Sequence, residues 1–200
     1  MVGCLQSINS LNQSESVPLE KLLNELDFSK NLVIGVDGYD GSGKTTLTNK
    51  LGGVFPVDII SLDDYLYKER DCYVAALDLG RLQRTLVQRP RSIVMEGVCL
   101  LEVMSKLQVK CSFLIYIKRI SEMGEWFDEE ECTPMDDPEA FLVELGEQSR
   151  LFSGFVRDGE GRSYTADGGA VTGLRKEIIL YHTKYDPVAS ADCVVLRTCS

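Results

Sequence analysis

Residues 38–46 combine glycines, a lysine and two threonines at a spacing that suits the binding of a polyphosphate. Their sequence, Gly-Tyr-Asp-Gly-Ser-Gly-Lys-Thr-Thr, contains the pattern G-x-x-x-x-G-K-T. Glycines allow backbone N–H groups to turn inward around phosphate oxygens, and a following helix directs the positive end of its dipole to the same place. This segment therefore predicts a site for a nucleoside triphosphate.

Each position in this phosphate loop has its own predicted role. Lys44 is expected to reach the β- and γ-phosphates of ATP, the Thr45 hydroxyl to enter the Mg²⁺ shell, and Thr46 to lie near the α-phosphate. The residues expected to contact the nucleotide are Gly38, Asp40, Gly41, Ser42, Gly43, Lys44, Thr45 and Thr46. The alternative is a glycine-rich turn that only joins a strand to a helix, but such a turn does not need lysine and threonine at fixed positions.

Three carboxylates lie where predicted strands end. Asp63 and Asp64 follow the run 57–62, and Glu96 ends the run 92–96. A carboxylate at such a position can accept a proton from an acceptor hydroxyl or hold magnesium, and phosphoryl transfer uses both. Because successive strand residues point to opposite sides, we favour Asp63 over Asp64 as the catalytic base, and Glu96 as part of the magnesium site. Helix capping is the alternative role.

The elements that must position these residues follow from hydrophobic patterning. Nearly continuous apolar runs alternate with helical stretches, which is typical of a parallel sheet covered on both faces. We expect strands at 32–37, 57–62, 92–96, 110–117 and 192–197. Right-handed crossovers place the ligand crevice at the carboxyl ends of such strands, where the phosphate loop and the carboxylates fall.

The expected fold class is α/β, a three-layer α/β/α sandwich of the P-loop NTPase type with about five parallel strands. Residues 17–200 are expected to form a single domain, because 200 residues with 44% apolar content suit one core. Residues 1–16 are rich in Ser, Asn and Gln and are expected to be disordered. Residues 124–173 break the pattern and are expected to form a mobile insertion or lid, with a helix near 138–150.

Composition restricts the partners. The net charge of −10, from 21 basic and 31 acidic side chains, argues against nucleic acid as a partner. Seven cysteines without a C-x-x-C pair indicate reduced thiols rather than a disulfide framework or a zinc site. No stretch is long enough to span a bilayer and the N-terminus is unlike a signal peptide, so we expect a cytoplasmic protein with no membrane partner. The sequence indicates no particular oligomeric state.

Four segments together resemble the uridine kinase family of small-molecule kinases, which is related to the pantothenate kinase and phosphoribulokinase group. They are residues 34–46, 62–67, 93–97 and 181–187, the last followed by Ala191-Asp192. Many NTPases share the phosphate loop, so the order of the segments carries the resemblance, over 31–118 and 176–197. The resemblance implies an ATP-dependent kinase that uses magnesium and phosphorylates a hydroxyl of a small metabolite, with a nucleoside as the acceptor.

The same resemblance implies roles for individual residues. Asp63 matches the aspartate that deprotonates the acceptor hydroxyl in that family, and Glu96 matches a glutamate that helps to position magnesium. Asp78, which follows Ala76-Leu77, matches an aspartate that binds substrate hydroxyls. His182 lies in a family-like Tyr-His context and is a candidate for substrate contact, with packing as the alternative.

The chain departs from the family in its positive charge. Uridine kinases carry several arginines after the fourth strand, which close over the phosphates, whereas here only Lys118 and Arg119 follow that strand as candidate lid residues. Four further arginines could replace them, and the sequence does not choose among Arg150, Arg157, Arg162 and Arg175. The acidic block 125–137 is expected to be solvated, or to face a cationic partner or substrate. Tyr65 and Tyr67 either wall the acceptor pocket or pack beneath the loop.

Three functional hypotheses are therefore compared. The leading one is the ATP-dependent phosphotransferase. The alternative from another class is a catalytically degenerate nucleotide-binding protein with a regulatory or assembly role. The small number of arginines after the fourth predicted strand favours it. A GTPase switch is disfavoured because Asp158-x-x-Gly161 lies in a predicted loop, and Asn49-Lys50 is followed by Leu51-Gly52 rather than by the aspartate that reads guanine.

Overall fold

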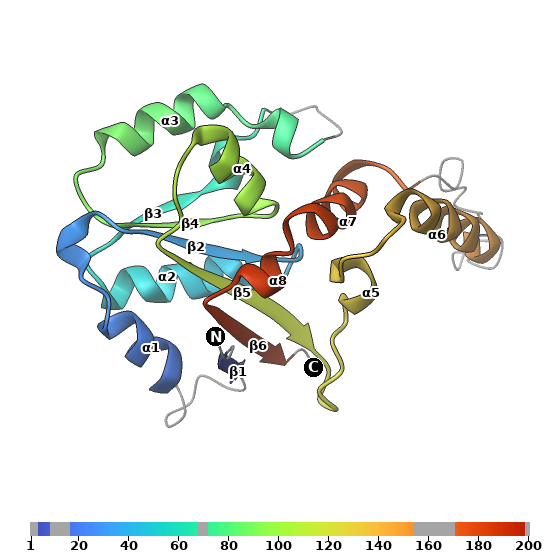
Figure 1. The fold of residues 1–200 in the computed structure, drawn as a ribbon, viewed down its shortest axis with the longest axis horizontal. Coiled ribbons are helices and arrows are strands. Elements are labelled where there is room, and N and C mark those ends of the chain that lie inside the picture. Colours follow the sequence, from blue (N-terminus) through green and yellow to red (C-terminus); the bar gives the residue numbers. More distant parts are fainter. Residues whose placement is uncertain (1–3, 9–16, 68–71, 154–170, 199–200) are drawn as a thin grey trace, which may run out of the picture.

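A six-stranded parallel sheet forms the centre of the computed structural model, which describes residues 4–8, 17–67, 72–153 and 171–198 (Figure 1). Across the sheet the strand order is β1-β6-β5-β2-β4-β3. The strands are β1 Cys4–Ile8, β2 Val33–Gly38, β3 Asp58–Ser61, β4 Ile93–Glu96, β5 Phe113–Ile120 and β6 Cys193–Thr198. All five strands expected from the apolar runs are present in it, and the expected α/β fold class is confirmed.

Helices cover both faces of this sheet, because alternating strand residues build a core on each side. Val94 packs with the α1 and α2 side, whereas its neighbours Ile93 and Met95 pack with the α3, α4 and α7 side. The helices are α1 Val17–Asn24, α2 Lys44–Val54, α3 Leu79–Gln88, α4 Leu100–Leu107, α5 Glu129–Cys132, α6 Pro138–Ser153, α7 Gly173–Tyr185 and α8 Pro187–Ser190. Short 3-10 turns η1, η2 and η3 span Phe28–Lys30, Leu62–Tyr65 and Val74–Ala76.

The segment expected to be an insertion contains α5 and α6, which lie to one side of the sheet and against α7 (Figure 1). Leu142 and Leu145 of α6 form a small separate core with Ile179 of α7. A helix is present over the stretch where one was expected, and α5 lies within the acidic block 125–137. Residues 154–170 lie outside the described part of the chain, so motion of this segment stays a prediction.

The N-terminal segment differs from the expectation of disorder over residues 1–16. Cys4–Ile8 form β1, which pairs in parallel with β6 from Cys4 opposite Cys193 to Ile8 opposite Arg197. Without it β6 would be an edge strand with a row of unpaired backbone groups, and pairing satisfies them. Residues 9–16 lie outside the described residues. Among the helices that are described, none has the length and apolar character that crossing a membrane requires.

Candidate functional site

The phosphate loop joins the end of β2 to the start of α2. Gly41 and Gly43 have φ angles of 69° and 94°, a left-handed conformation that glycine adopts without steric strain. A Cβ atom at Gly43 would lie 2.7 Å from Nη1 of Arg197, a flexible side chain that can move aside, so the φ angle rather than the space requires glycine there. Because α2 begins at Lys44, its first N–H groups and the positive end of its dipole lie at the loop. The loop therefore has the polarity of an anion site.

Lys44 lies on the inner side of this loop and is only 8% exposed. Its Nζ donates to the carbonyl oxygens of Gly38 at 3.2 Å and Tyr39 at 2.8 Å. Burial lowers the pKa of Lys44, and nearby carboxylates, chiefly that of Asp37, oppose the shift. The Ser42 hydroxyl is buried and has no hydrogen-bond partner among the described residues. An ammonium group and a spare buried hydroxyl beside backbone amides fit a bound phosphate group.

Glu96 joins two hydroxyl groups beside the loop. Oγ1 of Thr45 and Oγ of Ser61 both donate to Oε1 of Glu96, at 3.1 and 2.6 Å, and Glu96 is almost fully buried. Mg²⁺ prefers oxygen ligands of this kind and uses one or two carboxylates together with water and substrate phosphates. Within the described residues no group of three or more His, Cys, Asp and Glu side chains could hold a metal unaided. Thr45 and Glu96 are thus brought together as expected, and Ser61 is an addition that we did not predict.

Asp63 lies in η2, directly after β3, and is exposed at the same edge of the sheet. Its Oδ1 accepts a hydrogen bond from the hydroxyl of Tyr73 at 2.6 Å. Burial and the Asp63 carboxylate raise the pKa of Tyr73, so this phenol remains a donor. The carboxylate therefore already binds a hydroxyl group, which is the contact that a general base makes with an acceptor. Tyr73 was not predicted, because no sequence pattern marks it.

Two of the predicted substrate residues have structural contacts. Asp78 is the N-cap of α3, where its Oδ1 accepts from the N–H of Arg81 at 2.8 Å, and this bond with one from Tyr67 lowers the pKa of Asp78. Tyr65 is buried in the core, with the Arg81 guanidinium 4.7 Å from its ring centroid. These contacts give Asp78 a capping role and agree with the packing alternative for Tyr65.

His182 is buried in α7, and substrate contact, for which its sequence context made it a candidate beside packing, does not fit its surroundings. Its Nε2 lies 2.7 Å from the hydroxyl of Tyr116, and its Nδ1 lies 2.8 Å from the carbonyl oxygen of Ile178. Burial lowers the pKa of His182 to about 4. Both ring nitrogens have internal partners and the side chain is 1% exposed, so the packing alternative describes this residue.

The two candidate lid residues leave β5 in different directions. Arg119 donates to Asp128 with Nε at 2.9 Å and with Nη2, and its guanidinium lies 5.2 Å from the ring centroid of Tyr39 in the loop. Lys118 packs over Trp126, with Nζ 3.7 Å from the ring centroid. Only Arg119 therefore lies beside the phosphate loop, and a carboxylate of the acidic block holds it there.

Two further arginines reach the same region. Arg197 of β6 lies opposite Arg119 in the sheet register, and its Nη1 donates to the carbonyl oxygen of Gly41 at 3.1 Å. Arg175 of α7 donates to Oε1 of Glu131 at 3.1 and 2.6 Å, while Oε2 of Glu131 accepts from the Tyr39 hydroxyl at 2.7 Å. Of the other candidates, Arg150 lies in α6, and Arg157 and Arg162 lie outside the described residues.

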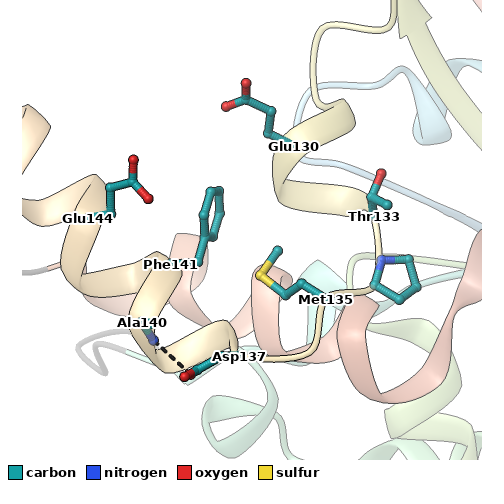
Figure 2. A pocket seen from close by; sticks show the side chains of 8 residues that line it. Glu130, Thr133, Met135, Asp137, Ala140, Phe141 and Glu144 are labelled. Carbon is teal, nitrogen blue, oxygen red and sulfur yellow. Dashed lines mark hydrogen bonds between the residues drawn. The ribbon is translucent and has the colours of Figure 1, made fainter.

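A hollow of about 470 Å³ lies away from the loop, between α5 and α6 (Figure 2). Met135 and Phe141 form its apolar floor, and Glu130, Asp137 and Glu144 lie around it. Because its charged groups are all carboxylates, this hollow suits no phosphate. The phosphate site is therefore defined by the loop and the strand ends rather than by this hollow.

The comparisons with known proteins give likenesses of structure only. No family model and no curated protein matches the sequence. One similar solved structure is a possible uridine kinase from Bacillus stearothermophilus, at 18% identity and a TM-score of 0.47 over 88% of this chain and 95% of that one. An uncharacterised protein from Eubacterium ventriosum matches at 13% identity and 0.34, over 84% and 90% of the two chains. A candidate kinase from Chloroflexus aurantiacus matches at 16% and 0.37, over 84% and 88%.

Proposed function

We propose that this chain is an ATP-dependent phosphotransferase that phosphorylates a hydroxyl group of a small metabolite, with a nucleoside as the expected acceptor. One observation carries the proposal. Several functional groups lie together at the carboxyl ends of the strands. They are the Lys44 ammonium in the loop, the hydroxyls of Thr45 and Ser61 on Glu96, and the exposed carboxylate of Asp63. These are the groups that bind a triphosphate, hold magnesium and accept a proton.

The geometry supports a direct transfer. Asp63 accepts the proton of the acceptor hydroxyl while the hydroxyl oxygen bonds to the γ-phosphorus, and the bond from that phosphorus to the bridging oxygen of ADP breaks. Lys44 offsets negative charge on the phosphate oxygens, and Arg197 adds positive charge beside the loop. Thr45 and Glu96 would hold magnesium, which when bound neutralises phosphate charge.

A second function is favoured by one specific observation. Arg119 and Arg175, which with Arg197 could neutralise charge during transfer, are each paired with a carboxylate, Asp128 and Glu131. A protein whose arginines stay engaged in this way would bind ATP without transferring its phosphoryl group. It would then serve as a nucleotide-dependent regulatory or assembly protein.

A screen with radiolabelled ATP separates these functions. Wild-type protein with magnesium is incubated with nucleosides, pantothenate, sugars and other hydroxyl metabolites, and labelled products are separated. We expect one class of acceptor to be labelled, and Lys44→Ala to lower the rate by about 100-fold or more. ATP binding without any labelled product would favour the regulatory alternative. Full activity of Lys44→Ala would contradict the assignment of the phosphate loop.

The partners and location follow the same proposal. We propose a small-molecule acceptor, without nucleic acid or membrane partners, in the cytoplasm. The net charge of −10 supports the absence of a polyanionic partner. The free thiols of Cys72, Cys99, Cys111 and Cys132 support a reducing compartment.

A further inference from the structure

Asp37 is a buried carboxylate on the strand that leads into the phosphate loop. It is the next-to-last residue of β2 and has no exposed surface. One of its oxygens, Oδ1, accepts from the backbone N–H of Gly38 at 2.7 Å, and Oδ2 accepts from the hydroxyl of Tyr181. Burial raises the pKa of Asp37 to about 6. Placing a carboxylate here costs stability, so its contacts call for a reason beyond packing.

Those contacts join the loop to two helices. The Tyr181 hydroxyl, which donates to Asp37, accepts from the backbone N–H of Leu101 at 3.1 Å in the first turn of α4. The positive end of the α4 dipole therefore lies close to the carboxylate. Lys44, on α2, attracts the same charge. The other titratable groups that sense this charge are the thiols of Cys99, Cys111 and Cys132 and the phenols of Tyr116 and Tyr181.

Tyr181 also lies on a path to the candidate base. Four residues earlier, on the same face of α7, Glu177 accepts from the backbone N–H of Tyr73. The hydroxyl of Tyr73 in turn donates to Asp63. One turn of α7 thus carries both Glu177, which binds the backbone of Tyr73, and Tyr181, which binds the carboxylate of Asp37. Through Tyr73 this turn is connected to the candidate base Asp63.

We propose that Asp37 is a positioning residue, which fixes the Gly38 amide at the start of the phosphate loop and ties that loop through Tyr181 to α7. In this arrangement α7 keeps the phosphate loop and Asp63 at a fixed separation. The effect on nucleotide affinity rests on the proposed function, whereas the effect on the order of the loop does not.

Titration calorimetry with magnesium and a nonhydrolysable ATP analogue at pH 7.5 tests the first effect. We expect Tyr181→Phe to weaken binding about tenfold, because it removes one hydrogen bond to the carboxylate. Tyr116→Phe is the matched control: it also removes one fully buried hydroxyl, bonded to His182 rather than to Asp37, and should change affinity by less than about twofold. Equal effects of the two variants would overturn the proposal.

Substitutions of Asp37 itself separate its two contacts. Asparagine has one acceptor oxygen where the carboxylate uses two, so it can keep the contact with the Gly38 amide but not the one with the Tyr181 hydroxyl, and Asp37→Asn should bind about tenfold more weakly than wild type. Asp37→Ala keeps neither contact and should bind about 30-fold more weakly. If Asp37→Asn binds as weakly as Asp37→Ala, the contact with the Gly38 amide does not position the loop, and the proposal is wrong.

Hydrogen exchange without nucleotide tests the second effect. Amides of residues 38–43 should exchange about tenfold faster in Tyr181→Phe than in Tyr116→Phe or wild type. If wild type binds no nucleotide, the proposed function fails, while this measurement still decides whether Tyr181 orders the loop. Equal exchange in all three proteins would overturn the inference, whatever binds to the site.

Discussion

At the residue scale, the pair Asp63 and Asp64 offers a direct test of the chemistry, because both are exposed aspartates in η2. We expect Asp63→Asn to lower kcat by about 100-fold to 10,000-fold, since the amide cannot take the proton of the acceptor. Binding of magnesium and nucleotide should change little, because Asp63 lies outside the loop. Steady-state rates, together with circular dichroism as a check of folding, measure this.

Asp64→Asn is the matched control, since the same change is made one position along the chain. It should retain nearly full rate. Equal losses in both variants would mean that the charge of η2, rather than the Asp63 carboxylate, supports the reaction.

Residue types and spacing could predict the part of the site that a local pattern encodes. Lys44, Thr45 and Glu96 lie together as predicted, because the loop pattern and the strand ends fix them. Arg197 could not be predicted in the same way. It follows an ordinary apolar run, and only the pairing of β6 with β5 brings it to Gly41, which is 156 positions away in sequence.

His182 and Asp78 show what sequence context leaves open. Both lie in sequence contexts that suit substrate binding, but burial and a helix N-terminus decide their contacts. Such contacts depend on where the folded chain places each residue, which the Tyr-His and Ala-Leu-Asp patterns do not specify.

At the scale of elements, Glu131 attaches α5 to two other parts of the molecule, because it binds Arg175 of α7 and Tyr39 of the loop. We expect Glu131→Gln to weaken this attachment by about 1 kcal/mol, because an amide cannot replace the ion pair with a partly exposed arginine. Amides of residues 129–132 should then exchange about fivefold faster, as measured by hydrogen exchange with mass spectrometry.

The neighbouring residue provides the comparison for this change. Glu130 is exposed beside the hollow of Figure 2, and Glu130→Gln removes the same charge from the same helix. Exchange over 129–132 should stay at the wild-type rate. Faster exchange in this variant as well would show that total charge, and not the Glu131 contacts, sets the stability of α5.

The elements divide by how strongly their residues are patterned. The five strands β2 to β6 follow from apolar runs, because a parallel sheet covered by helices on both faces takes mostly apolar side chains. By contrast, β1 forms from a segment that composition alone marks as disordered, since its partner is the backbone edge of β6. The short α5 lies in an acidic block with no helical period of apolar residues, so tertiary contacts rather than patterning account for it.

At the scale of the whole molecule, His182 makes the stability depend on pH. Its pKa is about 4 in the folded protein, below the ordinary value of 6.5, because burial opposes the charged form. Between these values the unfolded chain binds more protons at this residue, so its contribution to stability is complete above about pH 6.5 and is lost as the pH falls to about 4. The loss approaches roughly 3 kcal/mol.

Comparison with His182→Gln isolates this contribution, because every other titrating group, including Asp37, is common to both proteins. Urea unfolding is measured at several pH values. The free energy of unfolding of wild type minus that of the variant should rise by about 3 kcal/mol from pH 4 to pH 7. A constant difference would mean that His182 titrates equally in the folded and unfolded states.

The architecture of the molecule could be predicted further than its chemistry. Alternation of apolar runs with helical stretches suffices for a parallel α/β sheet, since few topologies satisfy it. The contacts around Asp63 come from residues that meet only in the folded chain, since Tyr73 precedes η3 and Glu177 lies on α7. Contacts between residues so far apart in sequence produce no local spacing pattern from which they could be predicted.

The carbonyl partners of Lys44 have a consequence for the design of inhibitors. The ammonium group already donates to the carbonyl oxygens of Gly38 and Tyr39. An inhibitor that competes with the nucleotide must therefore replace these hydrogen bonds with its own. A neutral compound that merely occupies the phosphate loop leaves those bonds in place, and Lys44 then adds nothing to its binding affinity. An anionic head group is therefore the first requirement for potency at this position, ahead of shape.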